Sequence, residues 1–342
     1  MTEKEKNAKK KILIIYDIDD NWWETEKREV YDSVKSLKTA LLKKKFEVED
    51  IEINRKEDLT IKLKKYSNNN VLIFNWCESI PGLPQSEWKV PDALEKLGFA
   101  YTGSSADVLK LSYDKYRTIE ILKKNNIDIP FSKVYEHTHN LDWNIYPAIV
   151  KSAVDHCSLG ISPKSVVFNN DELKERIDYY LKNYNQPALV EVFIDGREFH
   201  VSVLGNEIIE VLPIAEMDYS KFEDIHDRLC TYESKFVPGS KHYSGIETLL
   251  PAPLTNDEFR KIIEVSKLSF KILGCRDYAR IDIRMLDNKI YVLDVNPNPD
   301  ISADASMACA AEFLGMDYSD FIEKLVNITI DRYSAASAKL KK

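Results

Sequence analysis

Hydrophobic and polar residues alternate in two neighbouring segments, 278–285 and 290–296, and this alternation predicts the two strands of a β-hairpin. Asp287 and Asn288, between the segments, are residue types that favour a turn. The apolar positions are Ile281, Ile283 and Met285 in the first segment, and Tyr291, Leu293 and Val295 in the second. The hairpin is therefore expected to have one apolar face and one polar face.

The composition of the polar face depends on how the two strands are aligned. A loop of three residues, 287–289, keeps both apolar sets on one face, whereas a loop of two residues mixes the faces. We therefore expect the longer loop, which places Asp282 opposite Asp294, and Arg280 opposite Asn296. The apolar pairs of this alignment are Ile281 with Val295, Ile283 with Leu293, and Met285 with Tyr291.

Two opposed carboxylates need a compensating charge. At 4 Å and an effective dielectric constant near 20, Asp282 and Asp294 repel each other by roughly 4 kcal/mol. A magnesium ion between them, with Asn296 as a neutral oxygen ligand, would remove this repulsion. The alternative is a solvated polar face on which Arg280 and Arg284 neutralise the acids. The alternation alone favours neither interpretation.

The first hundred residues show strand and helix patterns in turn. Strands are expected at 12–16, 46–53 and 71–76, and helices at 25–44 and 91–97. This order is typical of a doubly wound parallel sheet, in which ligands bind beyond the carboxyl ends of the strands. Two of these strand ends lead into 17–24 and 75–85, which are acidic and aromatic. Later helices are expected at 256–273, 304–314 and 318–331.

Length, charge and cysteine content exclude several classes of protein. The chain has 342 residues, enough for two or three packed units, and a net charge of −8, which disfavours nucleic acid as a partner. No apolar run approaches the roughly 18 residues of a membrane span, and the Lys/Glu-rich start is unlike a secretory signal. The five cysteines include no CxxC pair, so neither a disulfide framework nor a zinc site is predicted. We expect a reduced, cytoplasmic protein.

The segments 274–282 and 293–299 resemble the metal-binding end of ATP-grasp ligases, and they are most similar to the D-alanine–D-alanine ligase branch of that superfamily. Matching motifs extend from about Val71 to the C-terminal helices. The resemblance implies ATP, two Mg²⁺ ions for which Mn²⁺ could substitute, and Arg280 as the group that stabilises an oxyanion. The implied metal ligands are Asp282, Asp294 and Asn296, with Asp294 standing where relatives usually carry a glutamate.

The resemblance also implies the order of domains. An N-terminal Rossmann-like domain is expected at 1–106, a central ATP-grasp lobe at 107–192, a C-terminal ATP-grasp lobe with the metal site at 193–333, and a disordered tail at 334–342. The expected fold class is therefore α/β with α+β lobes: a doubly wound parallel sheet followed by a two-lobed ATP-grasp domain.

Several further residues match positions that contact the nucleotide in the resembling family. A small-residue loop at 152–160 would offer backbone N–H groups to the phosphates. The implied phosphate contacts are Lys115, Lys151, Ser158 and Lys235, with Lys241 as the alternative to Lys235. The implied contacts of the nucleoside are Glu191, Val192, Phe193 and Ile194 for adenine, and Glu198 for the ribose hydroxyl groups.

The substrate-binding segments depart from the family. In place of its glycine-rich turn this chain has 17–24, which includes Trp22, Trp23 and Glu24. These residues form either a differently shaped substrate pocket or, in the case of the tryptophans, a staple for the following helix. Asp300 stands where the family has a glycine that binds the acceptor, and its charge would repel an acceptor carboxylate. We therefore expect a cationic or uncharged amine rather than free D-alanine.

The predicted reaction joins a small-molecule carboxylate to an amine, with an acyl phosphate as intermediate and ADP and phosphate as products. Three alternatives remain. They are a true D-alanine–D-alanine ligase with a remodelled pocket, a phosphotransferase that does not ligate, and a nucleotide-binding regulator without catalysis. The assembly is left open, with a homodimer as one option.

Overall fold

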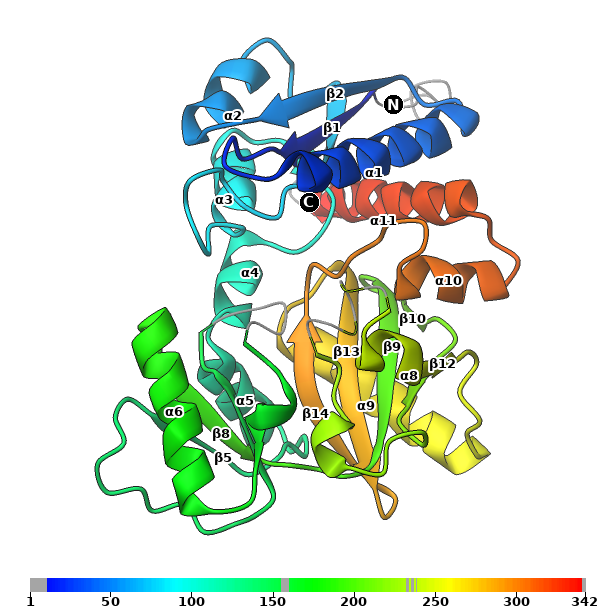
Figure 1. Ribbon diagram of the computed structural model, residues 1–342. Coiled ribbons are helices and arrows are strands. Elements are labelled where there is room, and N and C mark those ends of the chain that lie inside the picture. Colours follow the sequence, from blue (N-terminus) through cyan, green and yellow to red (C-terminus); the bar gives the residue numbers. More distant parts are fainter. Residues whose placement is uncertain (1–10, 155–159, 232–233, 235–236, 238, 340–342) are drawn as a thin grey trace.

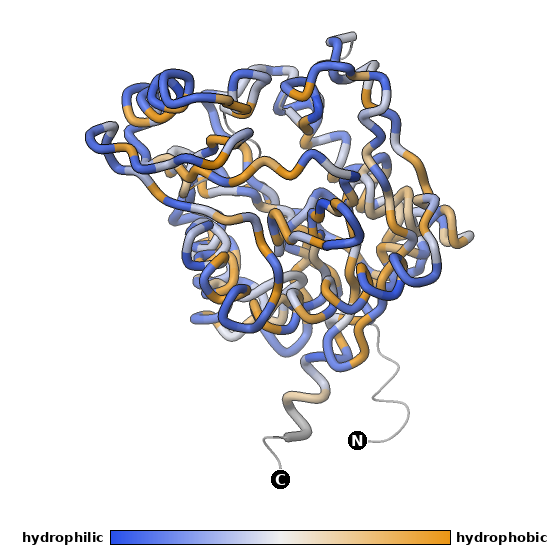
Figure 2. Tube along the Cα trace, turned by 90° about the horizontal axis from the view of Figure 1, so that it is seen from below, coloured by the Kyte–Doolittle hydropathy of each residue, from blue (hydrophilic) through white to orange (hydrophobic). Residues whose placement is uncertain are grey.

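The computed structural model describes residues 11–154, 160–231, 234, 237 and 239–339. Figure 1 shows an N-terminal domain above two lobes that stand side by side. In Figure 2 the hydrophobic segments gather in the interior, and the hydrophilic segments lie mainly at the periphery. Within the described residues, no helix is both long and apolar enough to cross a membrane.

Four parallel strands form the N-terminal sheet, in the order β2-β1-β3-β4. The elements are β1 (Lys11–Asp17), α1 (Glu24–Lys43), β2 (Val48–Ile53), α2 (Lys56–Leu63), β3 (Val71–Asn75), α3 (Lys89–Lys96) and β4 (Ala100–Tyr101), joined by the last helix of the chain, α11 (Tyr318–Lys339). In β1, Ile12 and Ile14 pack with α1 and α11, whereas Leu13 and Ile15 pack with α2 and α3. Helices therefore cover both faces, which confirms the doubly wound sheet.

The central lobe contains an antiparallel sheet in the order β5-β8-β6-β7, with α6 packed on one face. Its elements are α4 (Ala106–Ser112), α5 (Lys115–Lys124), β5 (Ser132–Tyr135), β6 (Ala148–Ser152), η1 (Pro163–Ser165), β7 (Val166–Val167), α6 (Asn170–Tyr184) and β8 (Ala188–Val192). Helix α5 begins at Lys115 because the Asp114 side chain accepts a hydrogen bond from the Arg117 N–H. This cap fixes Lys115 at the start of the helix.

The C-terminal lobe contains a six-stranded sheet in which β12-β11-β9-β13-β14 are neighbours and β10 pairs with β9. Its elements are β9 (Arg197–Gly205), β10 (Ile209–Val211), β11 (Ala215–Asp218), η2 (Ile225–Asp227), α8 (Lys241–Gly245), β12 (Glu247–Leu249), α9 (Asn256–Ile272), β13 (Asp277–Leu286), β14 (Lys289–Asn296) and α10 (Ser306–Phe313). Helix α9 covers the apolar face through Ile262 and Phe270. The opposite, polar face of β9, β13 and β14 is left for the site.

The hairpin of β13 and β14 corrects one prediction and confirms another. The loop has two residues, Asp287 and Asn288, both with positive φ (49° and 62°), as tight hairpin turns require. The three-residue loop is therefore wrong, and near the turn Ile283 pairs with Val292 rather than with Leu293. The register then shifts between Asp282 and Ile283, where an extra residue in β14 forms a β-bulge.

Beyond the bulge, the predicted alignment holds: Arg280 pairs with Asn296, Ile281 with Val295, and Asp282 with Asp294. The bulge also redistributes the apolar side chains. Val292 and Val295 are buried in the core, whereas Leu293 lines the site described below. The prediction that Tyr291, Leu293 and Val295 share one buried face is therefore wrong, because one extra residue reverses the alternation between them.

The C-terminal end differs from the predicted disordered tail at 334–342. Helix α11 continues to Lys339 and packs against α1 of the N-terminal domain (Figure 1), and the remaining part of the predicted tail, 340–342, lies outside the described residues.

Candidate active site

A cavity between the central and C-terminal lobes collects most of the residues predicted to bind a nucleotide. The predicted residues that line it are Lys115, Lys151, Glu191, Val192, Phe193, Ile194, Glu198, Asp282 and Asp294. Apolar side chains lining it include Ile149, Ile161, Leu229 and Leu293. Ser158 and Lys235 lie outside the described residues. A cavity with apolar walls and a few convergent charges is the usual form of a small-molecule site.

The polar face of the C-terminal sheet presents its side chains in three rows. The strand pairings place Glu198 beside Arg284, then His200 beside Asp282 and Asp294, then Ser202 beside Arg280 and Asn296. We call these the ribose row, the metal row and the oxyanion row, after the roles that the sequence predicts for their members. The rows follow from the period-two alternation of β9, β13 and β14. The bulge lies between the ribose row and the metal row, so the metal row and the oxyanion row keep the predicted alignment.

The metal row and the oxyanion row offer oxygen ligands that suit Mg²⁺ or Mn²⁺. They contain two carboxylates and one amide oxygen, the donor types that these hard cations bind. Asp282 forms a two-point ion pair with Arg280, at 2.7 Å to Nε and 2.9 Å to the terminal nitrogen. The Asp294 carboxylate lies 3.8 Å from the Lys115 ammonium. The residues present therefore fit a divalent cation, and basic groups compensate the two acids without one.

A buried ion pair lines the cavity. The Lys151 ammonium is 2.5 Å from one carboxylate oxygen of Glu191, whose side chain is 2% exposed. Burial lowers the pKa of Lys151, but the Glu191 carboxylate and the charges of Asp294 and Asp282 together outweigh burial, and the pKa of Lys151 is raised above its ordinary value. The other Glu191 oxygen is buried without a hydrogen-bond partner. This oxygen can accept a hydrogen bond from a ligand that enters the cavity.

Arg284 holds the ribose row together, a role that the sequence does not reveal. Its guanidinium donates to Glu198 at 2.8 Å and to the Ile194 carbonyl at 2.7 Å, and it stacks 4.6 Å from the centre of the Phe193 ring. Burial raises the pKa of Glu198, but the charges and hydrogen bonds of Arg284 and His200 together outweigh burial and hold that pKa well below its ordinary value. Glu198 is therefore an ionised acceptor with a fixed orientation.

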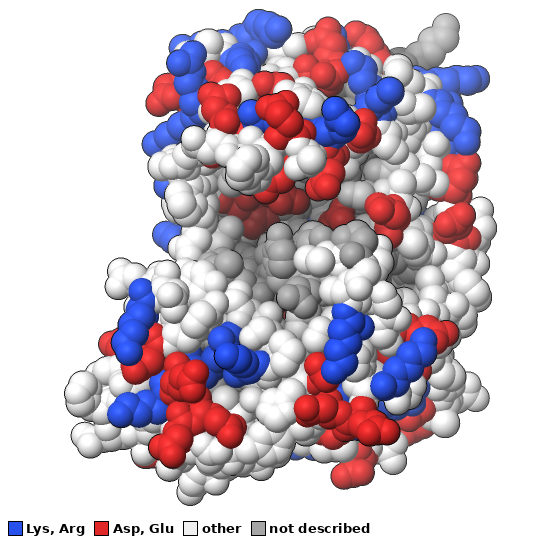
Figure 3. All heavy atoms as spheres, in the orientation of Figure 1, with Lys and Arg blue, Asp and Glu red and all other residues white. Residues whose placement is uncertain are grey.

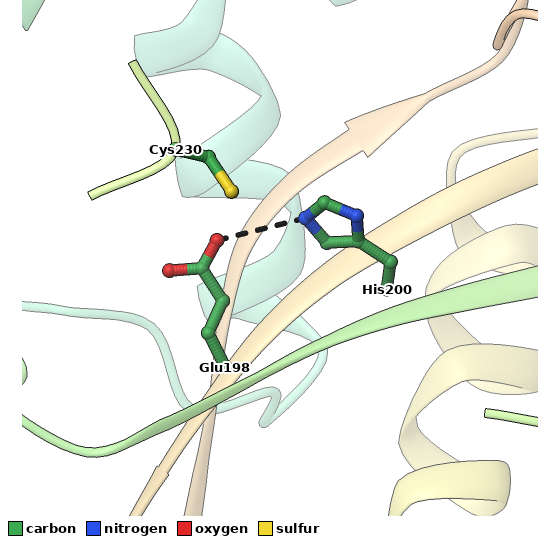
Figure 4. Close-up of side chains that lie close together, drawn as sticks. All are labelled: Glu198, His200 and Cys230. Atoms are coloured by element: carbon green, nitrogen blue, oxygen red, sulfur yellow. Dashed lines mark ion pairs between the residues drawn. The ribbon is translucent and has the colours of Figure 1, made fainter. Parts of the chain in front are cut away.

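Two further lining residues, His200 and Cys230, are absent from the sequence prediction. Figure 4 shows the His200 ring and the Cys230 thiol converging on Glu198, with His200 Nε2 3.6 Å from Glu198 Oε1. The alternation of β9 places His200 two residues after Glu198, so the period-two pattern could have placed it on the polar face. Lys241, the alternative to Lys235, pairs instead with Asp227 and does not line the cavity.

A group of acids from the N-terminal domain and the loop after β14 interacts electrostatically, and none of its members lines the cavity. It consists of Asp17, Glu78, Glu87 and Asp300. Asp17 accepts hydrogen bonds from the Glu78 N–H at 3.0 Å and from the Ser79 hydroxyl at 2.6 Å. Figure 3 shows acidic side chains at a hollow between the N-terminal domain and the two lobes.

Two of these acids hold protons more tightly than usual. Desolvation, and then the charges of Asp17 and Asp300, raise the pKa of Glu78 to about 7. Desolvation is also the main cause that raises the pKa of Glu87 to about 8, although Asn298 donates a hydrogen bond to it. A positively charged substrate group would reverse both shifts, because an opposite charge favours the ionised acid.

The predicted substrate residues at the start of α1 lie apart from the lining of the cavity. Trp22 packs against the core beneath α1, as a staple would. Trp23, the N-cap residue before the first turn of the helix, is 79% exposed, and Glu24 forms an ion pair with Lys27 at 3.4 Å. Asp300 accepts hydrogen bonds from the backbone N–H and the hydroxyl of Ser302.

A parallel N-terminal sheet, followed by two antiparallel lobes that close around a cavity with converging lysines and carboxylates, defines the ATP-grasp class of ligases. The chain belongs, within this class, to the D-alanine–D-alanine ligase family. The sequence model of that family described as "D-ala D-ala ligase C-terminus" matches residues 118–327.

Individual relatives agree with this assignment. The uncharacterized protein y4sG of Sinorhizobium fredii is 31% identical over 267 residues, which are 77% of this chain and 75% of that protein. The D-alanine–D-alanine ligase of Carboxydothermus hydrogenoformans is 30% identical over 306 residues, 85% of this chain and 90% of that protein. The crystal structure of D-alanine–D-alanine ligase from Bacillus anthracis, complexed with ATP, shares the fold with a TM-score of 0.74 at 20% identity, over 96% of this chain and 99% of that one.

Proposed function

We propose that this protein is a ligase that uses ATP to join the carboxylate of one small molecule to the amine of another. The observation that carries the proposal is the alignment of Asp282 with Asp294 on the wall of a cavity that Lys115 and Lys151 also line. Arg280 and Asn296 are aligned in the adjacent row of the sheet and do not line that cavity. Oxygen ligands beside clustered positive charges suit a polyphosphate with its metal ions.

In this proposal the nucleoside lies at the hinge between the lobes. Phe193 and Leu293 contact the base, the open oxygen of Glu191 accepts from its amino group, and Glu198 accepts from the ribose hydroxyl groups. Asp282, Asp294 and Asn296 would hold two Mg²⁺ ions, which supply charge neutralisation to the phosphates.

The chemistry proceeds in two transfers. The carboxylate of the first substrate attacks the γ-phosphate, and the bond to the β-phosphate oxygen breaks, which yields an acyl phosphate and ADP. The amine of the second substrate then attacks the acyl carbon and loses a proton, and phosphate leaves. Arg280 lies in the oxyanion row, held by Asp282, and its guanidinium would stabilise the negative oxygen that forms in the second transfer.

We also propose a cationic or uncharged amine, rather than free D-alanine, as the acceptor. The group of acids in the N-terminal domain and the loop after β14 supports this choice: desolvation, and then the charges of Asp17 and Asp300, raise the pKa of Glu78 to about 7. A carboxylate placed among them would add a further negative charge, whereas an ammonium would relieve their repulsion.

A screen for ADP release over pairs of carboxylates and amines tests the reaction. We expect ADP release that requires both substrates, equals the amount of amide formed, and disappears in the Asp294→Ala protein. ADP release that needs only a carboxylate would indicate a phosphotransferase, and none with any pair would indicate a regulator. Turnover of D-alanine alone that matches the best amine would overturn the proposed acceptor.

The acceptor has a separate test in Asp300→Asn. We expect kcat/KM for a cationic acceptor to fall about tenfold, because one attractive charge is lost, while kcat/KM for the carboxylate substrate stays within twofold. Asp304→Asn, which removes an exposed acid of the same loop, is the matched control. Equal kcat/KM values for the cationic acceptor in the two variants would contradict the role of Asp300.

A further inference from the structure

Glu198, His200 and Cys230 bring three kinds of metal-binding atom together at one place in the cavity. Glu198 and His200 both lie on β9, and Cys230 lies in the loop after η2. All three side chains line the cavity, and Figure 4 shows them converging. A carboxylate oxygen, an imidazole nitrogen and a thiol sulfur are the donors that bind zinc in proteins.

The distances between these atoms suit a tetrahedral ion. His200 Nε2 lies 3.6 Å from Glu198 Oε1, and the three donor atoms all lie within 4.8 Å of one another. Zinc bonds of roughly 2.0 Å to nitrogen and oxygen, and 2.3 Å to sulfur, separate tetrahedral ligands by roughly 3.3–3.6 Å. Glu198 and His200 are therefore close to the required separation, and a shift of about 1 Å is enough for the whole set.

The neighbours of the donor atoms favour the same arrangement. Arg284 donates to the second oxygen of Glu198, Oε2, at 2.8 Å, while Oε1 faces His200. The Tyr219 hydroxyl donates a hydrogen bond to the Cys230 sulfur at 3.2 Å, which favours the thiolate over the thiol. Hydrogen bonds of this kind orient the ligands of metal sites.

The donor set also differs from that of the proposed magnesium ligands. Those residues offer only oxygen atoms, which suit Mg²⁺, whereas nitrogen and sulfur donors suit zinc. A carboxylate and a thiolate together balance the two positive charges of a zinc ion. The lack of a CxxC pair in the sequence does not bear on this site, because only one cysteine takes part.

We propose that Glu198, His200 and Cys230 form a zinc site, and that zinc bound there excludes the nucleoside from the cavity. The sulfur binds as the thiol releases its proton to the solvent, and the imidazole binds in its neutral form. Three protein ligands leave a fourth position for water. Glu198 then binds the ion instead of the ribose hydroxyl groups, so zinc and the nucleoside compete. The competition rests on the proposed function, whereas the binding of zinc does not.

Cobalt tests the ligands directly. Co²⁺ replaces zinc in tetrahedral sites, and its bond to a thiolate gives an intense near-ultraviolet absorption that oxygen and nitrogen ligands alone do not give. The full chain is titrated with Co²⁺ in the presence of a phosphine reductant. We expect this absorption to saturate at an equimolar ratio in the wild type and to be absent in Cys230→Ala. In His200→Gln, Co²⁺ should bind at least about tenfold more weakly.

The matched control is Cys309→Ala, which removes another free cysteine that does not line the cavity. It should give the same cobalt absorption as the wild type. Unfolding curves without metal show whether Cys230→Ala is folded, and Cys230→Ser replaces it if it is not. No cobalt–thiolate absorption in the wild type, or the same absorption in the Cys230 variant, would overturn the zinc site.

Adenosine binding with and without zinc tests the competition, because adenosine has no phosphates that would bind zinc in solution. With zinc at about ten times its dissociation constant, the apparent affinity of the wild type and of Cys309→Ala for adenosine should fall about tenfold. In Cys230→Ala the same zinc concentration should change that affinity by less than about twofold. An equal zinc effect in Cys230→Ala and the wild type would overturn the competition at this site, because zinc would then act from elsewhere. A wild type that binds neither adenosine nor ADP without zinc would overturn the proposed function and the competition with it, and the cobalt absorption would still decide the zinc site.

Discussion

Asp282 and Asp294 lie directly opposite each other on β13 and β14, although the loop that joins the strands is one residue shorter than the alignment of their apolar residues requires. The β-bulge between Asp282 and Ile283 compensates for the shorter loop, because it adds one residue to β14. Two carboxylates in this relation repel unless positive charge lies close to both. Arg280 and Lys115 provide that charge, at 2.7 Å from Asp282 and 3.8 Å from Asp294. The arrangement is what a cation shared by two strands would require.

The first prediction concerns Asp294→Ala. We expect kcat for ligation to fall about a thousandfold, equivalent to about 4 kcal/mol, because one ligand of the proposed metal site is lost. Calorimetry supplies a second measurement: Mg²⁺ should strengthen ADP binding to the wild type and have little effect on the variant. Asp128→Ala removes an exposed carboxylate that pairs with Lys289 of the same hairpin, and it should behave as wild type. An equal Mg²⁺ effect in Asp294→Ala and the wild type would count against the metal site.

The second prediction concerns the pair of Lys151 and Glu191. Lys151→Met leaves a carboxylate that is 2% exposed without its ion-pair partner, so the free energy of unfolding should fall by about 3 kcal/mol. The double variant Lys151→Met/Glu191→Gln removes the buried charge as well and should regain most of that loss. Urea denaturation without nucleotide measures both. If the double variant were less stable than the single one, the cost would come from packing rather than from the unpaired charge.

The third prediction is a pH dependence of stability caused by Glu87. Its folded pKa is about 8, whereas its ordinary value is 4.5, chiefly because the side chain is desolvated. Between these two values the folded protein retains a proton that the unfolded chain has released. The free energy of unfolding therefore falls as pH rises from about 5 to 8, by up to about 1.4 kcal/mol per pH unit.

Glu87→Gln separates this contribution from those of other groups. The amide keeps an oxygen that can accept the hydrogen bond of Asn298 and cannot ionise. We expect wild type and variant to be similar near pH 5, and the variant to be the more stable near pH 8, by chemical denaturation at each pH. Glu57→Gln, at an exposed position of α2, is the control and should follow the wild type. Parallel stability curves for Glu87→Gln and the wild type would contradict the desolvated state of Glu87.

The sequence predicts those parts of the site that depend on alternation or on local motifs. The polar sets of β13 and β14 follow from period two. Lys115 is directly preceded by Asp114, a residue type that commonly caps helices, and the structure has that cap. Even the opposition of Asp282 and Asp294 is predicted correctly, although the loop assumed for it is wrong. Two errors in the prediction cancel there: the predicted loop is one residue too long, and the bulge in β14 is not predicted. The shorter loop and the extra residue of the bulge together give the predicted pairing of Asp282 with Asp294.

Other features depend on contacts between distant segments, which a single sequence does not specify. Arg284 joins Glu198 to the Ile194 carbonyl across 90 residues of chain, and no local pattern distinguishes it from a solvated arginine. The Glu87–Asn298 hydrogen bond spans 211 residues. The bulge itself has no clear signal either, because an isoleucine–valine pair and an isoleucine–leucine pair bury similar apolar surface.

The last prediction concerns Asp277, the first residue of β13, which connects the C-terminal lobe to the N-terminal domain. Its side chain is fully buried. It accepts hydrogen bonds from the Gly103 N–H at 2.9 Å, from Thr329 at 3.0 Å, and from Arg332 at 2.8 Å and 2.7 Å. Arg332 also donates to the Tyr101 carbonyl at 2.7 Å. One carboxylate thus holds β13, α11 and the end of the N-terminal sheet together.

Asp277→Ala should lower the free energy of unfolding by about 4 kcal/mol, because it leaves the largely buried Arg332 guanidinium without its partner. The backbone supplies a finer test. Asp277 has φ of +65°, a conformation that costs alanine roughly 1–2 kcal/mol and glycine little. Asp277→Gly should therefore be less destabilised than Asp277→Ala by about 1 kcal/mol, although both lose the same hydrogen bonds. Asp331→Ala, an exposed acid next to Arg332, is the control in the same denaturation experiment. If the alanine variant proved as stable as this control, the Asp277 carboxylate would not be what couples the domains, and the coupling would come from other contacts, such as the packing of α1 on α11 and the Lys43–Asp317 ion pair.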